Sequence, residues 1–461
     1  MGGDFDVRGR RVVVLGAARS GIAAAELLVR RGAAVMLSEM RPQFDGMERL
    51  RAAGVVVESG GHVPQTLLDA DLIVTSPGVP LEQPTIAAAR EKGVEIIGEL
   101  ELASRWVKGP IIAITGTKGK STTTTLIGRM LTAAGRRAVV GGNIGIPLSA
   151  QVDDSTADTV HVVETSSFQL ETTRTFRPWI SLWLNVADDH LDRHPDMASY
   201  VAAKARVLAN QQAGDIAVLN ADDARVVEQS AATSARRIWF APSGRLQEGF
   251  VVDGAWIVRR TATAREPMVP TAAVELSGRH MLDNVTAAVA VCWAAGISPD
   301  AMTQGLRGFR GLEHVMEPVG RIGGVSFVND SKATNVEAAR RSIESFATGV
   351  VAIVGGRFKG GDLRELVPAL RAHAKAVIAI GEATPLVSAA VGDAVPVTEA
   401  TSMREAVARG YERAMPDGVV LLAPACASFD WFRDYAERGR AFKQEVQQLK
   451  EHVGRGFSPG R

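Results

Sequence analysis

One stretch, residues 111–131, constrains the fold of this chain more than any other, and it reads IIAITGTKGKSTTTTLIGRML. Its apolar β-branched start is typical of a buried strand, its turn is rich in glycine, and its end carries apolar residues at helical spacing. A strand, a tight turn and a helix in this order direct backbone amides toward an anion. Lys120 can then reach the outer phosphates, and the hydroxyl of Ser121 or Thr122 can hold Mg²⁺. The pattern predicts a site for a nucleoside triphosphate rather than an ordinary turn, although Ile114 stands where the common P-loop has its first glycine.

The N-terminal stretch RVVVLGAARSGIAAAELLVRRGAAVMLSE has the pattern of a dinucleotide-type βαβ unit. It predicts a strand over 12–15, a helix over 22–30 and a second strand that ends at Ser38 and Glu39. The turn reads GxxxxG, and Ala18 stands where a glycine lets the backbone approach the diphosphate of NAD. The pattern therefore disfavours an NAD-dependent oxidoreductase and favours another nucleotide or its diphosphate at the start of this helix.

Alternating strand and helix patterns recur along the 461 residues and predict an α/β fold of three domains, each with a mostly parallel sheet. We expect a Rossmann-like domain over 1–104, a central P-loop domain over 105–312 and a Rossmann-like domain over 313–461. Alternation between residues 240 and 270 predicts a small antiparallel excursion in the central domain. Its FVVDGAWIV segment is typical of a hairpin that turns at Asp253-Gly254.

Polar residues follow the predicted strands of the central domain. Asn143 lies in the glycine-rich turn of GGNIGIP. Glu164 ends the apolar strand of VHVVE, where an acid is either a Mg²⁺ partner of the phosphate loop or a helix-capping carboxylate. The next strand ends in ADDHLDRHP, which holds a cluster that suits metal or phosphate binding: Asp188, Asp189, His190 and Asp192. We expect His62 and His194 to be surface residues.

The helix SYVAAKARVLAN places a lysine within an apolar stripe. The residues that share this face are Tyr200, Val201, Lys204, Val207 and Leu208. Lys204 is either a lysine whose ammonium group extends to water or a buried amine, for which desolvation disfavours the charged form. A buried amine of this kind can be covalently modified.

In the third domain, every predicted strand ends in a polar or glycine-rich turn. Ligands of parallel sheets bind at the carboxyl ends of the strands, so side chains from these turns should face one crevice. They are Asp330, Lys332, Thr334, Asn335, Lys359 and Ser428. Two lysines and several hydroxyl groups in this set suggest an acidic substrate. Before this domain, Asn284 begins a long apolar helix, where an asparagine is either a cap or a ligand contact.

The composition excludes several partners. The 52 Lys and Arg residues nearly balance the 51 Asp and Glu residues, so nothing favours nucleic acid or an anionic membrane. The two cysteines, Cys292 and Cys426, lie in apolar stretches and are expected to be core residues of a protein in a reducing compartment. No stretch reads as a signal peptide or a membrane span. We expect a cytoplasmic protein that acts as a monomer.

Several motifs together resemble those of the Mur ligases. They are GTKGKST, GGNIGIP, VVETSSFQLET, LNVADDHLDRH, NDSKATN, SPGVP and ACASFDWFRDY, and they occur in the family's order along essentially the whole chain. NDSKATN and PACASFD resemble the branch that adds D-glutamate. The resemblance implies an ATP-dependent, Mg²⁺-dependent ligase of peptidoglycan precursor synthesis. Its implied substrates are UDP-N-acetylmuramoyl-L-alanine (UDP-MurNAc-L-Ala) and D-glutamate.

The matching motifs also imply roles for individual residues. The implied ATP-binding residues are Gly116, Thr117, Lys118, Gly119, Lys120, Ser121, Thr122, Asn284 and Asp330. The implied metal residues are Ser121, Glu164, His190 and Lys204, of which Lys204 would carry a carbamate, and the implied catalytic residues are Lys120, His190 and Lys204. The implied substrate contacts are Ser38, Glu39, Ser76, Gly78, Asn143, Lys332, Thr334, Lys359, Ser428 and Tyr435. The chain departs from the family pattern at Val315, which stands where Arg is usual, at Met281, where Asn is common, and at Tyr435, where Phe is frequent.

Two alternatives stay open from the sequence. One is another ligase of the same kind, such as a folylpolyglutamate-type ligase or a Mur ligase that adds a different residue. The other is a nucleotide-binding sensor or regulatory protein that uses these folds without ligation.

Overall fold

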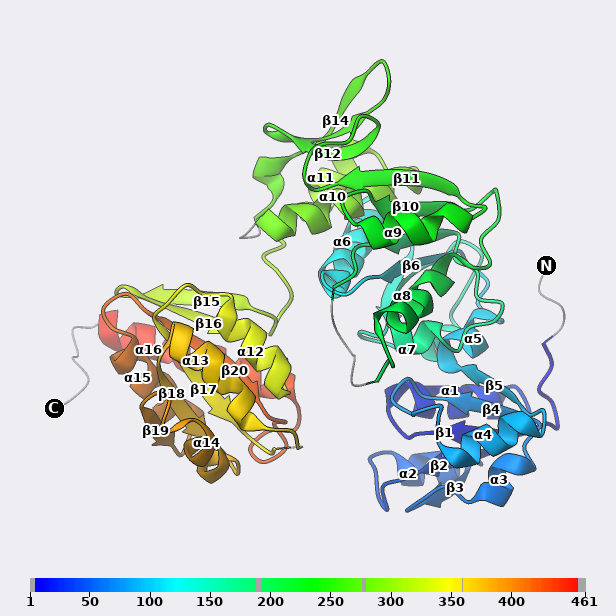
Figure 1. Ribbon diagram of the computed structural model, residues 1–461, viewed down its shortest axis with the longest axis horizontal. Helices are drawn as coiled ribbons and strands as arrows, with labels where there is room; N and C mark the ends of the chain where they lie inside the picture. Colours follow the sequence, from blue (N-terminus) through cyan, green and yellow to red (C-terminus); the bar gives the residue numbers. More distant parts are fainter. Residues whose placement is uncertain (1–4, 188–192, 276–278, 359, 455–461) are drawn as a thin grey trace. The chain divides into compact units, whose positions relative to one another are not determined.

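The computed structural model describes residues 5–187, 193–275, 279–358 and 360–454, and it contains three β-sheets that follow one another along the chain (Figure 1). Two compact units make up the chain. Unit 1 spans residues 1–309 and holds the first two sheets, and unit 2 spans residues 310–461 and holds the third. The predicted α/β fold with three mostly parallel sheets is confirmed. None of the described helices is long and apolar enough to cross a membrane.

The first sheet is entirely parallel, in the order β3-β2-β1-β4-β5. Its strands are β1 (Arg11–Leu15), β2 (Ala34–Glu39), β3 (Val56–Ser59), β4 (Leu72–Thr75) and β5 (Glu95–Gly98). Its helices are α1 (Arg19–Arg30), α2 (Met47–Ala52), α3 (Pro64–Leu68), α4 (Pro84–Glu91) and α5 (Glu99–Ser104). Residues of α1 and α2 pack on one face of this sheet, and residues of α3 and α4 pack on the other. The central strands β1 and β4 are apolar on both faces because helices cover both.

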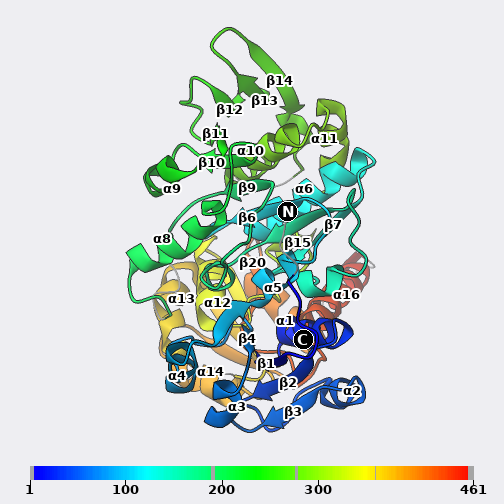
Figure 2. The ribbon, with the colours of Figure 1, turned by 90° about the vertical axis from the view of Figure 1, so that its right-hand side faces the viewer.

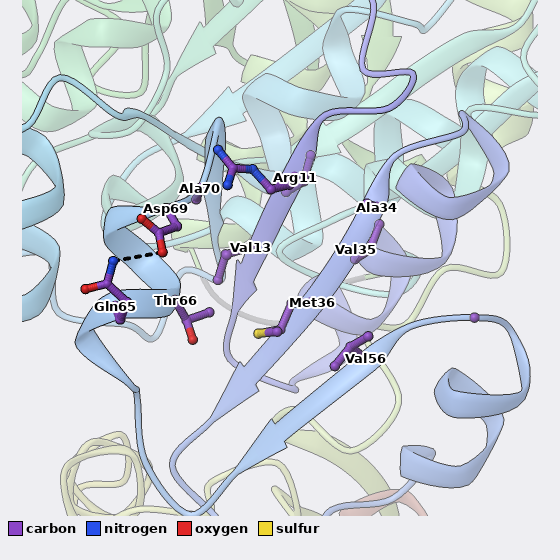
Figure 3. Close-up of a pocket in the computed structure, with 12 residues that line it drawn as sticks. Arg11, Val13, Ala34, Val35, Met36, Val56, Gln65, Thr66, Asp69 and Ala70 are labelled. Carbon is purple, nitrogen blue, oxygen red and sulfur yellow. Dashed lines mark hydrogen bonds between the residues drawn. The ribbon is translucent and has the colours of Figure 1, made fainter.

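Helices α3 and α4 cover only part of their face, which leaves a hollow over β2 and β3 (Figure 3). Val56 on β3 is 59% exposed there, and Met36 on β2 lines the same hollow of about 460 Å³. Gln65 of α3 and Asp69, the residue after this helix, form a hydrogen bond of 2.8 Å at the wall of the hollow. Arg11 begins β1, so the hollow lies near the starts of the strands, away from their carboxyl ends.

The central sheet has nine strands in the order β14-β13-β12-β11-β10-β9-β6-β8-β7. The two pairings at the β14 end, β12 with β13 and β13 with β14, are antiparallel (Figure 2). Its strands are β6 (Ile111–Thr115), β7 (Ala138–Gly142), β8 (Val160–Glu164), β9 (Ile180–Trp183), β10 (Ile216–Asn220), β11 (Arg236–Ala241), β12 (Gly249–Asp253), β13 (Trp256–Arg260) and β14 (Arg265–Pro270). Its α-helices are α6 (Lys120–Ala133), α7 (Ser167–Leu170), α8 (Met197–Ala205), α9 (Ala224–Gln229), α10 (Arg279–Ala294) and α11 (Pro299–Leu306). Short 3₁₀ turns are η1 (Leu148–Gln151), η2 (Arg206–Leu208), η3 (Ser230–Ala232) and η4 (Thr271–Ala273). The predicted hairpin is confirmed, because Asp253 pairs with Trp256 across its turn.

Two acidic residues of α5 join the first sheet to the central one within unit 1. Glu101 is fully buried and accepts hydrogen bonds from the backbone amides of Arg174, Thr175 and Phe176, at 2.8 to 3.1 Å. Glu99 is also buried and accepts one from the amide of Ser149 at 2.6 Å. Burial alone raises the pKa of Glu99. Burial acts the same way on Glu101, but hydrogen bonds led by the Thr175 hydroxyl outweigh it and hold that pKa below its usual 4.5.

Glu101→Gln is expected to destabilise unit 1 by about 2 kcal/mol, because a buried carboxylate that accepts several hydrogen bonds is replaced by a neutral amide. The folded-state pKa of Glu101 is lowered. Its stabilisation is therefore present above the unfolded value and lost as the pH falls through the folded pKa. Urea unfolding should show a lower free energy of unfolding than wild type at pH 7, and a smaller difference in this free energy near pH 3. Glu91→Gln, an exposed change on α4, serves as the control. An equal effect of both substitutions would contradict the role of Glu101.

The third sheet, in unit 2, has the order β15-β16-β20-β17-β18-β19, and only the β15–β16 pair is antiparallel. Its strands are β15 (Glu317–Ile322), β16 (Val325–Asn329), β17 (Val350–Gly355), β18 (Ala374–Ile380), β19 (Val397–Ala400) and β20 (Val419–Ala425). Its helices are α12 (Val336–Glu344), α13 (Val367–His373), α14 (Thr384–Val391), α15 (Met403–Ala414) and α16 (Tyr435–Gly454), with the 3₁₀ turn η5 (Leu363–Leu366). Apolar cores lie on both faces of this sheet. The carboxyl ends of β16 and β20 are neighbours, which places the turns after them side by side.

Candidate active site

The phosphate loop lies between β6 and α6, as the sequence predicts. Gly116 and Gly119 have φ angles of 150° and 83°, which residues with a side chain rarely adopt. Helix α6 begins at Lys120, and among the described residues no side chain caps its first turn. Its first backbone amides are therefore available to an anion, to which the positive end of the helix dipole is also attracted.

Asn185, two residues after the end of β9, fixes the backbone conformation of this loop. Its side-chain Oδ1 accepts hydrogen bonds from the amides of Thr117 and Lys118 at 3.0 and 2.9 Å. Its Nδ2 donates to the carbonyl of Lys118 at 3.1 Å. Asn185 was not among the residues that the sequence predicted for this site. The parallel pairing of β6 with β9 is what brings it to the loop.

Two lysines donate to one carbonyl oxygen of the loop. The Nζ of Lys120 lies 2.9 Å from the carbonyl oxygen of Gly116, and the Nζ of Lys204 lies 2.8 Å from the same atom. Lys204 is only 1% exposed, and its Nζ lies 4.5 Å from the centre of the Tyr200 ring. The buried alternative for Lys204 is confirmed, since its helix face, with Tyr200, Val201, Val207 and Leu208, is also buried.

Ser121, Glu164 and Asn143 form a cluster beside the start of α6. The hydroxyl of Ser121 donates to Glu164 Oε2 at 2.6 Å, and the amide of Asn143 donates to Glu164 Oε1 at 2.7 Å. Mg²⁺ prefers oxygen ligands and, beside phosphates, takes only one or two of them from the protein. A hydroxyl and a carboxylate at the phosphate loop fit that requirement. Residues 188–192, with Asp188, Asp189, His190 and Asp192, lie outside the described part of the chain.

Asn284, on α10, lies directly against the loop. A side-chain carbon added at Gly119 would fall 2.1 Å from Asn284 Oδ1, so the loop needs glycine at this position. The amide of Asn284 also faces Met281, with Nδ2 3.9 Å from its sulfur. The predicted ATP-binding residue is therefore next to the phosphate loop in this structure.

The predicted residues of the first sheet surround the turn between β1 and α1. Glu39 Oε2 accepts a hydrogen bond from the amide of Ala17 at 2.6 Å, and Ser76 donates to the carbonyl of Gly16 at 3.0 Å. Burial acts to raise the pKa of Glu39, but hydrogen bonds from Arg41 and the backbone hold it at about 2. Gly78 follows in a turn with open space around it. Residues from the ends of β2 and β4 thus surround the start of α1. The side chain of Arg19 there donates to the carbonyl of Gly145 at 3.0 Å.

His62 and His194 were expected at the surface, and the structure contradicts this expectation for His194. His62 is half-buried, and its Nδ1 lies 2.8 Å from the hydroxyl of Ser38, a predicted substrate contact. His194 is only 4% exposed and packs between two aromatic rings. A histidine in a polar sequence context gives no sign of burial, because the packing partners come from distant segments.

In unit 2 the predicted residues gather at the carboxyl ends of β16 and β20. Burial raises the pKa of Asp330, which accepts hydrogen bonds from Ser342 and from the amide of Met316. Lys332 is exposed, and its carbonyl accepts a hydrogen bond from the amide of Thr334 at 2.8 Å. Ser428 is buried in the turn after β20, whereas Tyr435, at the start of α16, is 39% exposed.

The predicted residue Asn335 has a structural role in this domain, because it caps α12 by accepting a hydrogen bond from the amide of Ala338. Lys359 lies outside the described residues.

Arg438, which sequence reasoning missed, holds these two turns together. It is 1% exposed, and it donates to the hydroxyl and the carbonyl of Ser331, both at 3.0 Å, and to the carbonyl of Cys426 at 3.1 Å. Burial lowers the pKa of Arg438 to about 10. An arginine on a charged helix face looks solvent-exposed in sequence. Cys426 and Cys292 are both buried, as expected.

Models of known protein families match most of the chain. The Mur ligase MurD-like N-terminal domain matches residues 10–98, the Mur ligase middle domain matches 114–292, and the Mur ligase glutamate ligase domain matches 316–426. The chain belongs to the Mur ligase family. Mur ligases are ATP-dependent and usually require Mg²⁺, which agrees with an uncapped helix start beside Lys120, Ser121 and Glu164.

Two relatives of this Mur ligase carry the same name. A UDP-N-acetylmuramoylalanine–D-glutamate ligase of Acidobacterium capsulatum is 46% identical over 447 residues, which is 96% of this chain and 97% of that protein. A protein of the same name from Pelotomaculum thermopropionicum is 43% identical, over 97% of this chain and 99% of that one. Among solved structures, the UDP-N-acetylmuramate-alanine ligase MurC of Thermotoga maritima is similar in fold, with a TM-score of 0.56, 18% identity, and coverage of 96% of this chain and 100% of that chain.

Proposed function

We propose that this Mur ligase joins D-glutamate to UDP-MurNAc-L-Ala in an ATP-dependent reaction of peptidoglycan precursor synthesis. The observation that carries the ATP dependence is the uncapped start of α6, with Lys120 in its first turn and the Ser121–Glu164 pair beside it. The choice of D-glutamate is supported by the shared name of relatives that match this chain over nearly its full length.

The reaction follows from the poor electrophilicity of a carboxylate. The terminal alanyl carboxylate attacks the γ-phosphorus of ATP, the bond to the β–γ bridging oxygen breaks, and an acyl phosphate and ADP form. The amine of D-glutamate then attacks the acyl carbon, phosphate leaves, and the amine loses a proton. In such transfers catalysis is chiefly positioning and electrostatic stabilisation, which is what Lys120 and the backbone amides of α6 supply.

Several residues of this chain would hold the two nucleotides and the metal. The phosphate loop from Gly116 to Thr122, with Asn284 and Asp330, binds ATP. Ser121, Glu164, His190 and Lys204 would hold Mg²⁺, which would offset the negative charge of the phosphates. Ser38, Glu39, Ser76 and Gly78 bind the uridine diphosphate part of the substrate, and Asn143 contacts its muramoyl part.

The D-glutamate pocket is assigned to unit 2. Lys332, Thr334, Lys359, Ser428 and Tyr435 bind the amino acid there, and lysines and hydroxyl groups suit its two carboxylates. The domains that carry these roles are residues 1–104 for the uridine nucleotide, 105–312 for ATP and 313–461 for the amino acid.

Lys204 is assigned a carbamate. Its amine is buried and lies within hydrogen-bond distance of the same carbonyl as Lys120. The ammonium first loses a proton to give the neutral amine. Reaction of this amine with CO₂ then forms a C–N bond and releases a second proton, so that a cation becomes an anion overall. The change would replace two positive charges at Gly116 by an opposite-charge pair and would supply a carboxylate near the phosphate loop.

A coupled assay of ADP release tests the proposed function. With UDP-MurNAc-L-Ala and Mg·ATP present, D-glutamate should support turnover, and other amino acids, L-glutamate included, should support less than about a hundredth of that rate, since unpaired polar groups in a site discriminate strongly. Preference for another amino acid would favour a different Mur-type ligase. Replacement of the UDP substrate by a folate would test the folylpolyglutamate alternative. Nucleotide binding without any product would favour a sensor and contradict the proposal.

A further inference from the structure

A stack of aromatic and cationic side chains connects α7 to α8, and His194 lies at its centre. The His194 ring is stacked on Phe168, with ring centres 5.2 Å apart and an interplanar angle of 14°. On its other side the ring contacts Tyr200, with centres 5.3 Å apart. His194 is 4% exposed and Tyr200 is 1% exposed, so the contacts are closed to solvent. Aromatic pairs at such distances stabilise one relative placement of their rings.

The far end of the stack holds the phosphate loop. The Tyr200 hydroxyl lies 3.1 Å from the hydroxyl of Thr117, the residue after Gly116. The Lys204 ammonium lies over the same Tyr200 ring and donates to the Gly116 carbonyl. Both residues come from α8. The position of the Tyr200 ring therefore sets two of the contacts that the loop makes with this helix.

The near end of the stack is tied to the strand that carries Glu164. His194 Nε2 lies 3.0 Å from the hydroxyl of Ser167, the first residue of α7. The preceding residue, Ser166, caps this helix in a capping box with Gln169, which fixes the turn directly after β8. His194 thus connects the strand end of Glu164 with the helix of Lys204 and, through Tyr200, with the phosphate loop.

We propose that His194 is a positioning residue, which holds the Tyr200 ring in place and through it the Lys204 amine and Thr117 of the phosphate loop. The inference rests on the proposed function, in which the loop binds ATP and Lys204 acts beside it. His194 itself is packed between rings and hydrogen-bonded to Ser167, so it acts through Tyr200 and not on the reacting atoms. Displacement of a reacting or binding group by about 1 Å can lower a rate about 100-fold.

The test compares three variants at His194. His194→Ala removes the ring and the hydrogen bond, His194→Gln removes the ring and keeps an amide that can reach Ser167, and His194→Phe keeps the ring alone. Each is titrated with the Mg²⁺ complex of a non-hydrolysable ATP analogue in the absence of the other substrates. We expect the affinity to fall about tenfold or more for the alanine and glutamine variants and less than about threefold for the phenylalanine variant, because only the last keeps the stack.

Steady-state kinetics gives the second readout. The kcat of the alanine and glutamine variants should fall about 10- to 100-fold, while their KM for D-glutamate stays within about twofold of wild type, since the assigned D-glutamate residues lie in unit 2. Thermal unfolding of each variant shows whether it is folded at the assay temperature. The glutamine variant keeps the test open if the alanine variant does not fold.

Two results would overturn the proposal. One is wild-type nucleotide affinity and kcat in a folded variant that lacks the ring, which would leave His194 a purely structural residue. The other is a phenylalanine variant as impaired as the alanine variant, which would move the role to the hydrogen bond with Ser167. Failure of the wild-type protein to ligate D-glutamate would contradict the proposed function, whereas the binding comparison would still decide the role of the stack.

Discussion

Replacement of Lys120 by alanine is expected to lower kcat for ADP release about 1000-fold, the upper range for removal of one preorganised donor to developing charge. Lys120 lies in the first turn of α6, and its Nζ is held 2.9 Å from the carbonyls of both Gly116 and Thr117. These bonds keep the ammonium group over the loop, where the outer phosphates of ATP would replace the carbonyls as its partners. The loss should appear mainly in kcat, because the charge that moves in phosphoryl transfer is largest in the transition state.

The control for Lys120→Ala removes the same charge elsewhere. Lys375 is an exposed lysine of β18 whose ammonium lies 3.9 Å from Asp417, and Lys375→Ala should keep kcat within about twofold, since exposed ion pairs contribute little. Circular dichroism and thermal unfolding should show both variants folded. Near-normal ADP release by Lys120→Ala with both substrates present would contradict the assignment of the loop.

The sequence was sufficient for features that are local in the chain. The order of strand, glycine turn and helix around Lys120 predicts the phosphate loop because each of its parts lies within a few residues of the next. The helical spacing of Tyr200, Val201 and Lys204 predicts their common face for the same reason, and the structure buries all three. Its position at a strand end also predicted that Glu164 lies near the phosphate loop, because parallel strands present their carboxyl ends at one edge of the sheet.

Features that depend on packing between distant segments could not be read from the sequence. His194 is buried by Phe168 and Tyr200, and Arg438 is buried by Ser331 and Cys426, although each lies among polar neighbours in the chain. Asn185 became informative only when the pairing of β6 with β9 placed it beside Thr117. The burial of Glu101 likewise depends on residues 174–176 of the central-sheet region, whose backbone amides donate hydrogen bonds to its carboxylate. In each case the residue type occurs both at the surface and in the interior of proteins, and contacts from distant segments determine which of the two applies.

Replacement of Lys204 by alanine is expected to lower kcat about 100- to 1000-fold, because the proposed carbamate, an anionic ligand for Mg²⁺ near the phosphates, would be lost. The side chain is 1% exposed and reaches the Gly116 carbonyl, so its removal also leaves a cavity at the loop. If the working form of Lys204 is a carbamate, a short carboxylic acid can enter that cavity and supply the missing carboxylate. Acetate or formate should then restore part of the activity, with a saturable dependence on its concentration.

Two further variants separate this chemistry from a general salt effect. Lys204→Met fills the space with an uncharged chain of similar length, so acetate has no room and should give no rescue. Lys120→Ala lacks a cation, and a carboxylic acid should not restore it either. Rescue of all three variants would indicate an effect of ionic strength, and absence of rescue for Lys204→Ala at any acid concentration would count against the carbamate. An ammonium role for Lys204 predicts a different pattern: short alkylamines, and not carboxylic acids, would then restore Lys204→Ala, because the cation that donates to Gly116 would be the group that is missing.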